Sequence, residues 1–321
     1  MSRLASVASG PYAPPTPARE LTVVSADGAR LHVEVHGPEN APPVVLSHGW
    51  TCSTAFWAAQ IQDLAKDHRV IAYDQRGHGR SPVSPECTTR TLADDLEAVL
   101  AQTLARGEQA LVVGHSMGGM TVMAAATRPR FREHAAAVLL CSTGSSRLVA
   151  EARVVPLRAG GVRTWITGRV LGSRAPLGPV TPVAKSILKY ATMGAGSAPH
   201  MVEACARIVH ACPRAVRHAW AGVLEALDLD HGVRELDAPT AIVHGASDRL
   251  TPPVHARALA AALPQCVGLT ELTGVGHMTP IEAPDLVTGR IRDLVTTYVA
   301  VTGTGLEDEH RATPAQNKEG A

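Results

Sequence analysis

The sequence predicts an α/β fold in which helices cover both faces of a mostly parallel sheet. Short apolar segments of strand length alternate with helical segments along the 321-residue chain, and this alternation is typical of parallel sheets. Several apolar segments end in polar, glycine-containing loops, and ligands bind where the strand ends of such a sheet open. With 45% hydrophobic residues, the chain can bury a substantial core.

The expected elements follow one another in a regular order. Residues 21–24 and 31–35 alternate around Asp27-Gly28, which predicts an opening hairpin. Apolar runs predict the later strands. One lies directly before Asp74, and the others are at 43–47, 111–113, 136–140, 239–244 and 268–272. Helical segments fall between them, at 55–65, 92–104 and 117–126. The alternation is interrupted after Gly144 for some ninety residues, which predicts an inserted cap.

Ser116 is the candidate nucleophile. It lies in Gly114-His115-Ser116-Met117-Gly118, directly after an apolar strand and before an Ala- and Met-rich helix. A strand-to-helix turn this tight strains its central residue and brings backbone close together, so Gly114 and Gly118 stand where a Cβ would clash. A serine hydroxyl is a weak nucleophile, so it requires a histidine base and a carboxylate that orients the base.

Two later loops supply the acid and the base. Asp248 follows the strand at 239–244, and His277 lies in Gly274-Val275-Gly276-His277 after the strand at 268–272. We expect Asp248 to be the acid and His277 to be the base. Upstream, the segment His48-Gly49-Trp50 follows the strand at 43–47, where it can offer a backbone donor to an oxyanion.

Five ordered motifs carry a resemblance to a known family. These are His48-Gly49, Asp74 to Ser81, the Ser116 turn, Gly245 to Asp248 and Gly276-His277. The chain resembles the Ser-His-Asp enzymes of the α/β-hydrolase family from about residue 21 to 299, and its serine turn is similar to that of monoacylglycerol lipases and bacterial carboxylesterases.

The resemblance implies an eight-stranded α/β-hydrolase sheet with a helical cap, and a carboxylic ester hydrolase. Ser116, Asp248 and His277 would form the catalytic triad, and the N–H groups of Trp50 and Met117 the oxyanion hole. The substrate pocket would be lined by Trp50, Met117, Trp165 and Met278, which favours hydrophobic acyl or alcohol groups. The mechanism implied is acyl transfer through an acyl-enzyme, and it needs no cofactor.

Other polar residues near these motifs are interpreted as structural. Asp74 is expected to satisfy turn amides, His78 not to act as a base, and His48 to hold its loop by hydrogen bonding. His115 is expected to pack beside the nucleophile. The histidines show no ligand spacing on one helix face and no cysteine companions, so no metal site is expected.

The chain is expected to form one catalytic domain with an insertion. The core would comprise residues 21–144 and 237–300, with a cap at 145–236. Pro-, Ala- and Ser-rich residues 1–20 predict a flexible N-terminal arm, and polar residues 301–321 a flexible C-terminal tail. The first half of the cap has no clean helical period, whereas the second half predicts two helices separated near Pro213.

Charge and cysteine content limit the partners and the compartment. The net charge of +1 and the lack of a nucleic-acid-binding motif exclude nucleic acid as an expected partner. Six scattered cysteines without framework spacing, and no signal-peptide pattern, predict a reduced, cytoplasmic setting. The arginine-rich cap is either a solvated face or a surface attracted weakly to anionic lipid, which would place the protein at the membrane periphery. Nothing in the sequence fixes the oligomeric state.

Several functions of the same fold remain open. A serine at position 116 sets aside the aspartate-dependent epoxide hydrolases and haloalkane dehalogenases. Carbon–carbon bond hydrolases, thioesterases and cofactor-free haloperoxidase-like enzymes keep the serine triad and stay as alternatives. From another class, a ligand-binding or interaction protein of this fold is also an alternative.

Overall fold

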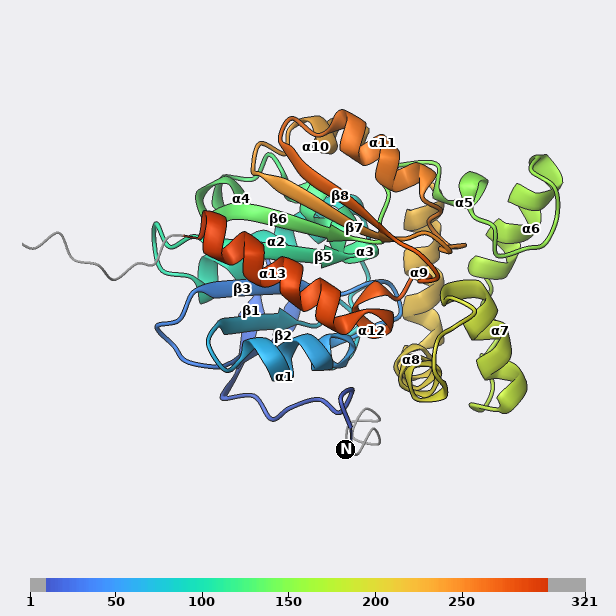
Figure 1. The fold of residues 1–321 in the computed structure, drawn as a ribbon, viewed down its shortest axis with the longest axis horizontal. Helices are drawn as coiled ribbons and strands as arrows, with labels where there is room; N and C mark the ends of the chain where they lie inside the picture. The colour runs from blue at the N-terminus through green and yellow to red at the C-terminus, as the bar shows by residue number, and fades with distance from the viewer. Residues whose placement is uncertain (1–9, 300–321) are drawn as a thin grey trace, which may run out of the picture.

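The computed structural model describes residues 10–299, which form one eight-stranded sheet with helices on both faces (Figure 1). The strand order is β1-β2-β4-β3-β5-β6-β7-β8. The β1–β2 and β2–β4 pairs are antiparallel and the other pairs are parallel. The mostly parallel sheet that the sequence predicts is therefore confirmed. The strands are β1 (Arg19–Val24), β2 (Arg30–His36), β3 (Pro43–Ser47), β4 (Arg69–Tyr73), β5 (Ala110–His115), β6 (Ala135–Cys141), β7 (Thr240–Gly245) and β8 (Cys266–Leu272).

Two apolar cores, one on each face of the sheet, explain why the central strands are apolar without interruption. In β3, Val44 and Leu46 pack on one face and Val45 on the other, because successive strand side chains point to opposite sides. One core includes side chains of α1 and α13, and the other includes side chains of α2 and α3. The core helices are η1 (Thr54–Trp57, 3₁₀), α1 (Ala58–Leu64), α2 (Thr89–Thr103), α3 (Met117–Ala125), α4 (Pro129–His134), α11 (Val254–Ala262), α12 (Thr279–Glu282) and α13 (Pro284–Tyr298).

Helices fill the long connection between β6 and β7. They are α5 (Leu148–Glu151), α6 (Gly161–Leu171), α7 (Pro182–Thr192), α8 (Pro199–Ala211), α9 (Arg214–Glu225) and α10 (Asp230–Arg234). The helices α6 to α9 lie together beyond one end of the sheet, on the right of Figure 1. At α10 the chain has returned to the core, because a Cβ on Gly232 would lie 2.2 Å from the Met123 carbonyl oxygen of α3.

The first half of the cap, residues 156–183, is more regular than its sequence suggests, since it contains helix α6. The period of α6 is hard to see because this helix buries little. Only Arg163 and Thr167 are buried in α6, and only Thr192 in α7. Apolar residues of α6 are therefore not confined to one side of the helix.

The expected N-terminal arm is held against the core over part of its length. The Tyr12 side chain is buried, and its hydroxyl donates a hydrogen bond of 2.8 Å to the carbonyl oxygen of Ile281. The strand β1 begins at Arg19, inside the range predicted to be flexible. Residues 1–9 of the arm, and the predicted tail at 301–321, lie outside the described residues.

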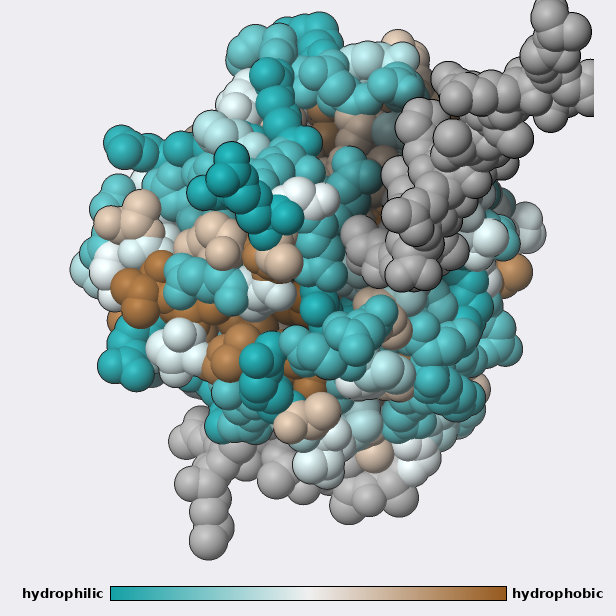
Figure 2. Space-filling view, turned by 90° about the vertical axis from the view of Figure 1, so that its left-hand side faces the viewer, coloured by the Kyte–Doolittle hydropathy of each residue, from teal (hydrophilic) through white to brown (hydrophobic). Residues whose placement is uncertain are grey.

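Between residues 10 and 299, none of the helices has both the length and the apolar character needed to cross a bilayer. Figure 2 shows the side of the molecule that is on the left in Figure 1, away from the cap helices. Most of this face is hydrophilic, and hydrophobic residues gather in one area of it.

Candidate active site

Ser116 occupies a strained turn between β5 and α3. Its backbone has φ 51° and ψ −117°, a conformation that costs a non-glycine residue about 1–3 kcal/mol. A Cβ on Gly114 would lie 2.5 Å from the Gly118 carbonyl oxygen, and one on Gly118 would lie 2.0 Å from that of Ser47. Both glycines are therefore required by close backbone approach, as the sequence predicts.

Asp248 and His277 come together at the ends of β7 and β8. His277 Nδ1 lies 2.8 Å from Asp248 Oδ2. Asp248 Oδ1 accepts hydrogen bonds from the N–H groups of Leu250, at 2.8 Å, and Thr251, at 2.9 Å. Burial acts to raise the pKa of Asp248, but the charge of His277 and these hydrogen bonds outweigh burial and hold the pKa below its usual value.

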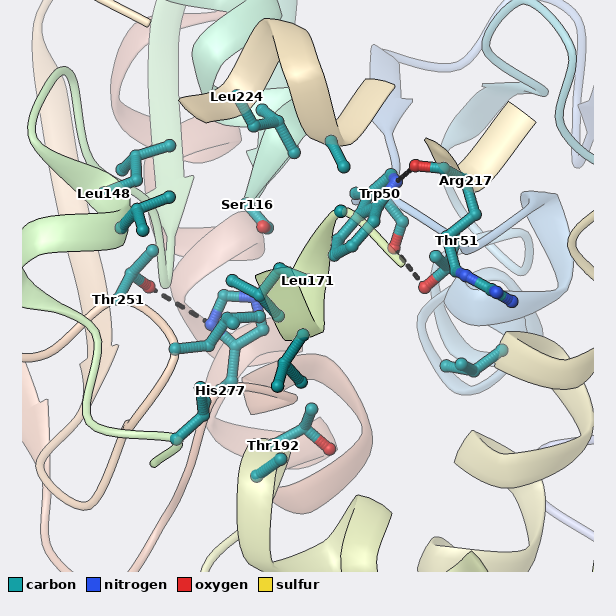
Figure 3. A pocket seen from close by; sticks show the side chains of 18 of the residues that line it. Trp50, Thr51, Ser116, Leu148, Leu171, Thr192, Arg217, Leu224, Thr251 and His277 are labelled. Carbon is teal, nitrogen blue, oxygen red and sulfur yellow. Dashed lines mark hydrogen bonds between the residues drawn. The ribbon is translucent and has the colours of Figure 1, made fainter. Parts of the chain in front are cut away.

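Ser116 and His277 line one cavity of about 230 Å³ between the sheet and the cap (Figure 3). The cavity is also lined by Trp50 and Met278, two of the residues predicted to contact substrate. Most of the other lining side chains are apolar and come from the cap, among them Leu148, Leu171, Leu177, Leu188, Val209 and Leu224. The structure thus brings the three predicted triad residues to the same end of the sheet, beneath the cap.

The predicted oxyanion loop lies against the nucleophile. A Cβ on Gly49 would lie 3.1 Å from Ser116 Cβ, so the backbone before Trp50 passes directly beside the serine. Within residues 10–299, neither the N–H of Trp50 nor that of Met117 donates to a protein acceptor. The Trp50 indole donates a 3.1 Å hydrogen bond to the Arg217 carbonyl oxygen, which fixes the loop against the cap.

Two residues predicted to contact substrate do not line this cavity. The Met117 side chain is fully buried in the core shared with α2, because the first turn of α3 directs it away from the cavity. Trp165 is 63% exposed on α6, where Arg169 lies 5.4 Å from its ring centroid. It faces away from the Ser116 cavity because Gly168 and Leu171 occupy the side of α6 that lines it.

Sequence reasoning missed a carboxylate that holds the His277 loop. Glu282 accepts hydrogen bonds from the N–H groups of Gly276 and Met278, at 3.1 Å each, on either side of the histidine. It also accepts from the cap, through the Gly194 N–H at 2.7 Å and the Ser197 hydroxyl at 2.6 Å. The only signal in the sequence is an acidic residue in the otherwise uncharged segment that follows His277.

Thr251 is a second residue that the sequence did not indicate. Its hydroxyl lies 2.9 Å from Asp248 Oδ2 and 3.1 Å from His277 Nδ1, so it borders the contact between the two groups. The hydroxyl is also 3.2 Å from the carbonyl oxygen of Ser142.

The neighbouring polar residues have structural partners. Asp74 accepts hydrogen bonds from the N–H groups of Thr54, at 2.8 Å, and Arg80, at 2.7 Å. His48 accepts from the Gln75 N–H and His78 from the Thr51 N–H, at 3.0 and 3.2 Å. Burial lowers the pKa of His48 to about 3 and that of His78 to about 4, so both rings stay neutral.

Among the described residues, Glu20, His32 and Glu34 bring potential metal-ligand atoms within 4.8 Å of one another. Glu20 is already paired through both oxygens with Arg80, and His32 Nε2 lies 3.1 Å from Glu34. Ion pairing accounts for this cluster, which lies on β1 and β2.

Comparison with known proteins agrees with the geometry. Residues 44–290 match the model of the alpha/beta hydrolase family. A putative carbamate hydrolase, RutD of Variovorax paradoxus, is 31% identical over 234 residues, covering 69% of this chain and 80% of the relative. The 3-oxoadipate enol-lactonase 1 of Acinetobacter baylyi is 35% identical over 103 residues, covering 32% of this chain and 38% of that protein.

Solved structures of an esterase and an enol-lactonase share the fold of this chain. A thermophilic esterase from Thermogutta terrifontis has a TM-score of 0.69 and 25% identity, covering 88% of this chain and 100% of its own. The enol-lactonase from Burkholderia xenovorans has a TM-score of 0.67 and 26% identity, covering 86% of this chain and 100% of its own. The family model spans most of this chain, and the structures share its fold. The chain therefore belongs to the alpha/beta hydrolase family and is a hydrolase.

Proposed function

We propose that the protein hydrolyses carboxylic esters with hydrophobic acyl or alcohol groups, through an acyl-enzyme on Ser116. The observation that carries the proposal is the strained Ser116 in the same cavity as His277, whose Nδ1 is 2.8 Å from Asp248. Backbone strain at a serine that opens into a cavity is typical of a nucleophile presented to substrate.

The proposed reaction has two steps. The Ser116 hydroxyl attacks the ester carbonyl carbon while His277 takes its proton, and the N–H groups of Trp50 and Met117 donate to the oxyanion. His277 then protonates the departing alcohol, which leaves Ser116 acylated. Water attacks the acyl group with His277 again as base, and the acid departs as Ser116 regains its proton. Asp248 keeps the Nδ1 proton on His277, so that Nε2 is free to accept.

The cavity supports a hydrophobic substrate. Its lining is dominated by Leu, Val, Ala and Met side chains, and its polar members apart from the residues of the reaction include Thr51, Thr192, Thr251, Arg217 and Glu225. Enclosed apolar pockets with a few convergent polar groups bind compact apolar ligands and orient them at those groups. A volume of about 230 Å³ suits a short acyl chain better than a long one.

A fluorophosphonate probe tests the nucleophile. We expect the probe to label the protein once, at Ser116, as mapped by mass spectrometry of peptides, and Ser116→Ala to abolish labelling. A protein of this fold that only binds ligands would stay unlabelled, and that result would overturn the proposal. Labelling at any other residue would overturn the assignment of Ser116.

A panel of p-nitrophenyl esters of increasing acyl length tests the substrate class. We expect kcat/KM to be highest for short hydrophobic chains, and Ser116→Ala to lower kcat by several powers of ten while the melting temperature stays near that of the wild type. Appreciable turnover by the alanine variant would show that the reaction does not use Ser116.

Lactone hydrolysis is the second candidate, because enol-lactonases are among both the sequence relatives and the similar structures. A lactone is an internal ester, so the same serine chemistry applies. Adding simple lactones, thioesters and carbamates to the panel separates these activities by kcat/KM.

A further inference from the structure

We propose that the outer face of the cap binds the surface of an anionic lipid bilayer. We define the outer face by the exposed side chains of α6, α7 and the segments that flank and join them. Its large apolar members that do not also line the Ser116 cavity are Leu157, Val162, Trp165, Val180, Val183, Ile187 and Tyr190. Both helices lie at the edge of the molecule farthest from the sheet (Figure 1).

The concentration of exposed apolar side chains on this face is unusual for the molecule. Between residues 10 and 299, 14 large hydrophobic residues are exposed, and seven of them belong to the outer face. Trp165 is 63% exposed, Val183 68% and Ile187 65%. Isolated exposed apolar residues are ordinary, but many of them gathered on one side of a molecule mark an interaction surface.

The helix periodicity shows that the exposure is built into both helices. In α7, Val183, Ile187 and Tyr190 follow the i, i+4, i+7 spacing of one face, and all three are exposed. The same helix turns Leu188 and Ala191 toward the cavity of Ser116. Because one side faces the cavity and the other carries apolar residues outward, solvent meets an apolar surface where a surface helix normally presents polar residues.

The basic residues of the outer face indicate which kind of partner it binds. From residue 152 to 202 the chain carries five Arg and two Lys and no Asp or Glu, although Arg163 is buried and Lys185 pairs with Glu203. Arg153, Arg158, Arg169 and Arg174 are exposed among the apolar side chains. If a second copy docked on this face, it would bring basic residues against basic residues. An anionic bilayer instead offers phosphate to the guanidinium groups and an apolar boundary to the side chains between them.

The Trp165 and Arg169 pair illustrates how such a face meets lipid. The Arg169 guanidinium lies 5.4 Å from the Trp165 ring centroid. Arginine lays its stem on apolar surface while its head reaches polar groups, and tryptophan favours the boundary between water and hydrocarbon. The pair therefore combines the two contacts that an anionic interface provides.

Vesicle co-sedimentation tests the proposal with the full chain. We expect binding to vesicles of phosphatidylcholine mixed equally with phosphatidylglycerol to exceed binding to phosphatidylcholine alone at least about tenfold at low salt, and to weaken at physiological salt. The Ser116→Ala variant should bind equally well, because the outer face does not include the active site. This separates the surface from the proposed reaction.

Matched variants locate the contact. Changing Arg158, Arg169 and Arg174 to Gln should lower partitioning by up to about a hundredfold at low salt, because each charge near an anionic surface contributes up to about a factor of five. Trp165→Ser with Ile187→Ser should also lower binding. The control is Leu286→Ser, which changes a residue 60% exposed on α13 and should leave binding unchanged.

Three results would overturn the proposal. One is no binding to either vesicle, and another is equal binding to neutral and anionic vesicles. The third is a dimer in size-exclusion chromatography that Trp165→Ser with Ile187→Ser converts to a monomer, which would assign the face to a second copy. Circular dichroism of each variant confirms that the fold is retained.

Discussion

His277 is held at both its ring and its main chain. Its Nδ1 contacts Asp248, its N–H donates to the Thr192 carbonyl oxygen at 2.8 Å, and its carbonyl oxygen accepts from His115 Nε2 at 2.9 Å. The ring of His115 therefore carries its proton on Nε2, and burial keeps its pKa well below the usual value. A base fixed in this way loses little entropy when it reaches its reactive geometry.

The two buried aspartates near the site should respond differently to the same substitution. We expect Asp248→Asn to lower kcat on the order of 10⁴-fold, because an amide beside Nδ1 favours the wrong tautomer of His277. Asp74→Asn should mainly lower the free energy of unfolding, since Asp74 accepts hydrogen bonds from two backbone N–H groups. Ester turnover and urea denaturation of both variants test this, and a small loss of kcat in Asp248→Asn would contradict the assignment of the acid.

Glu282 should act as a positioning residue for His277. In Glu282→Gln an amide NH₂ replaces one acceptor oxygen and faces backbone N–H groups, so the loop must shift. A misplaced base costs on the order of a hundredfold in kcat, with little change in KM. The pH profile of kcat/KM should also move, because the surroundings of His277 change.

The control for Glu282 is Glu203→Gln, a carboxylate of the cap that pairs with Lys185 at the surface. Glu282→Asp, which keeps the charge, should lie between wild type and Glu282→Gln in kcat. If Glu282→Gln lowered the melting temperature while kcat and the pH profile of the folded protein stayed unchanged, Glu282 would have only a structural role.

The residues that the sequence located are those whose chemistry depends on a local pattern. Ser116 is marked by its flanking glycines, and His277 and Asp248 by loops that follow apolar strands. Glu282 and Thr251 were missed because their role depends on backbone groups that only the folded chain brings within reach. Trp165 was misplaced because composition does not say which side of a helix faces the cavity.

At the level of elements, Arg76 ties the loop after β4 to helix α2. Its guanidinium donates to both oxygens of Asp95, at 2.7 and 2.5 Å, and to Asp27 at 2.8 Å. The Arg76 side chain is fully buried and that of Asp95 is 3% exposed. The pair therefore depends on its hydrogen bonds to offset the cost of removing both charges from water.

Breaking this pair should destabilise the protein strongly. We expect Arg76→Met to lower the free energy of unfolding by about 3–5 kcal/mol, because Asp95 would stay buried without its main partner. The double variant Arg76→Met with Asp95→Leu should recover most of that loss, since neither charge remains. Urea unfolding measures both, and equal loss in the single and double variants would contradict this account.

The sequence predicted the sheet elements better than the cap elements for a physical reason. A strand such as β5 is buried on both faces, so its composition is almost entirely apolar and its ends are abrupt. Helix α6 has solvent on one side and the cavity on the other. Apolar residues on both sides of a helix weaken the 3.6-residue period on which recognition depends.

At the level of the whole molecule, the site lies where the strand ends, the cap and helix α12 meet. Ser116, Asp248 and His277 follow β5, β7 and β8, which run parallel, so their loops lie at the same edge of the sheet. The cap is hydrogen-bonded to this edge at two residues of the core, Trp50 and Glu282. Movement of the cap would therefore change both the oxyanion loop and the base.

Stability should fall as the solution becomes acidic, because several histidines are buried as neutral rings. Burial lowers the pKa of His48 to about 3 and of His78 to about 4, and holds that of His115 well below its usual value. In the unfolded chain these rings take up protons below about pH 6.5, while in the folded protein they do not. Protonation therefore favours the unfolded state between about pH 6.5 and 4.

The three rings together should lower the free energy of unfolding by about 4 kcal/mol between pH 7.5 and 5.5. Asp74 opposes this in part, because burial raises its pKa to about 6 and it gains a proton in the folded state. Asp248 does not contribute in this pH range. Its pKa is lowered in the folded protein, so the stability that its charged form provides is lost only at lower pH. Urea unfolding at fixed ionic strength across this range measures the slope, and His78→Gln should make it shallower. A free energy of unfolding that stays constant from pH 7.5 to 5.5 would show that these rings exchange protons freely in the folded protein.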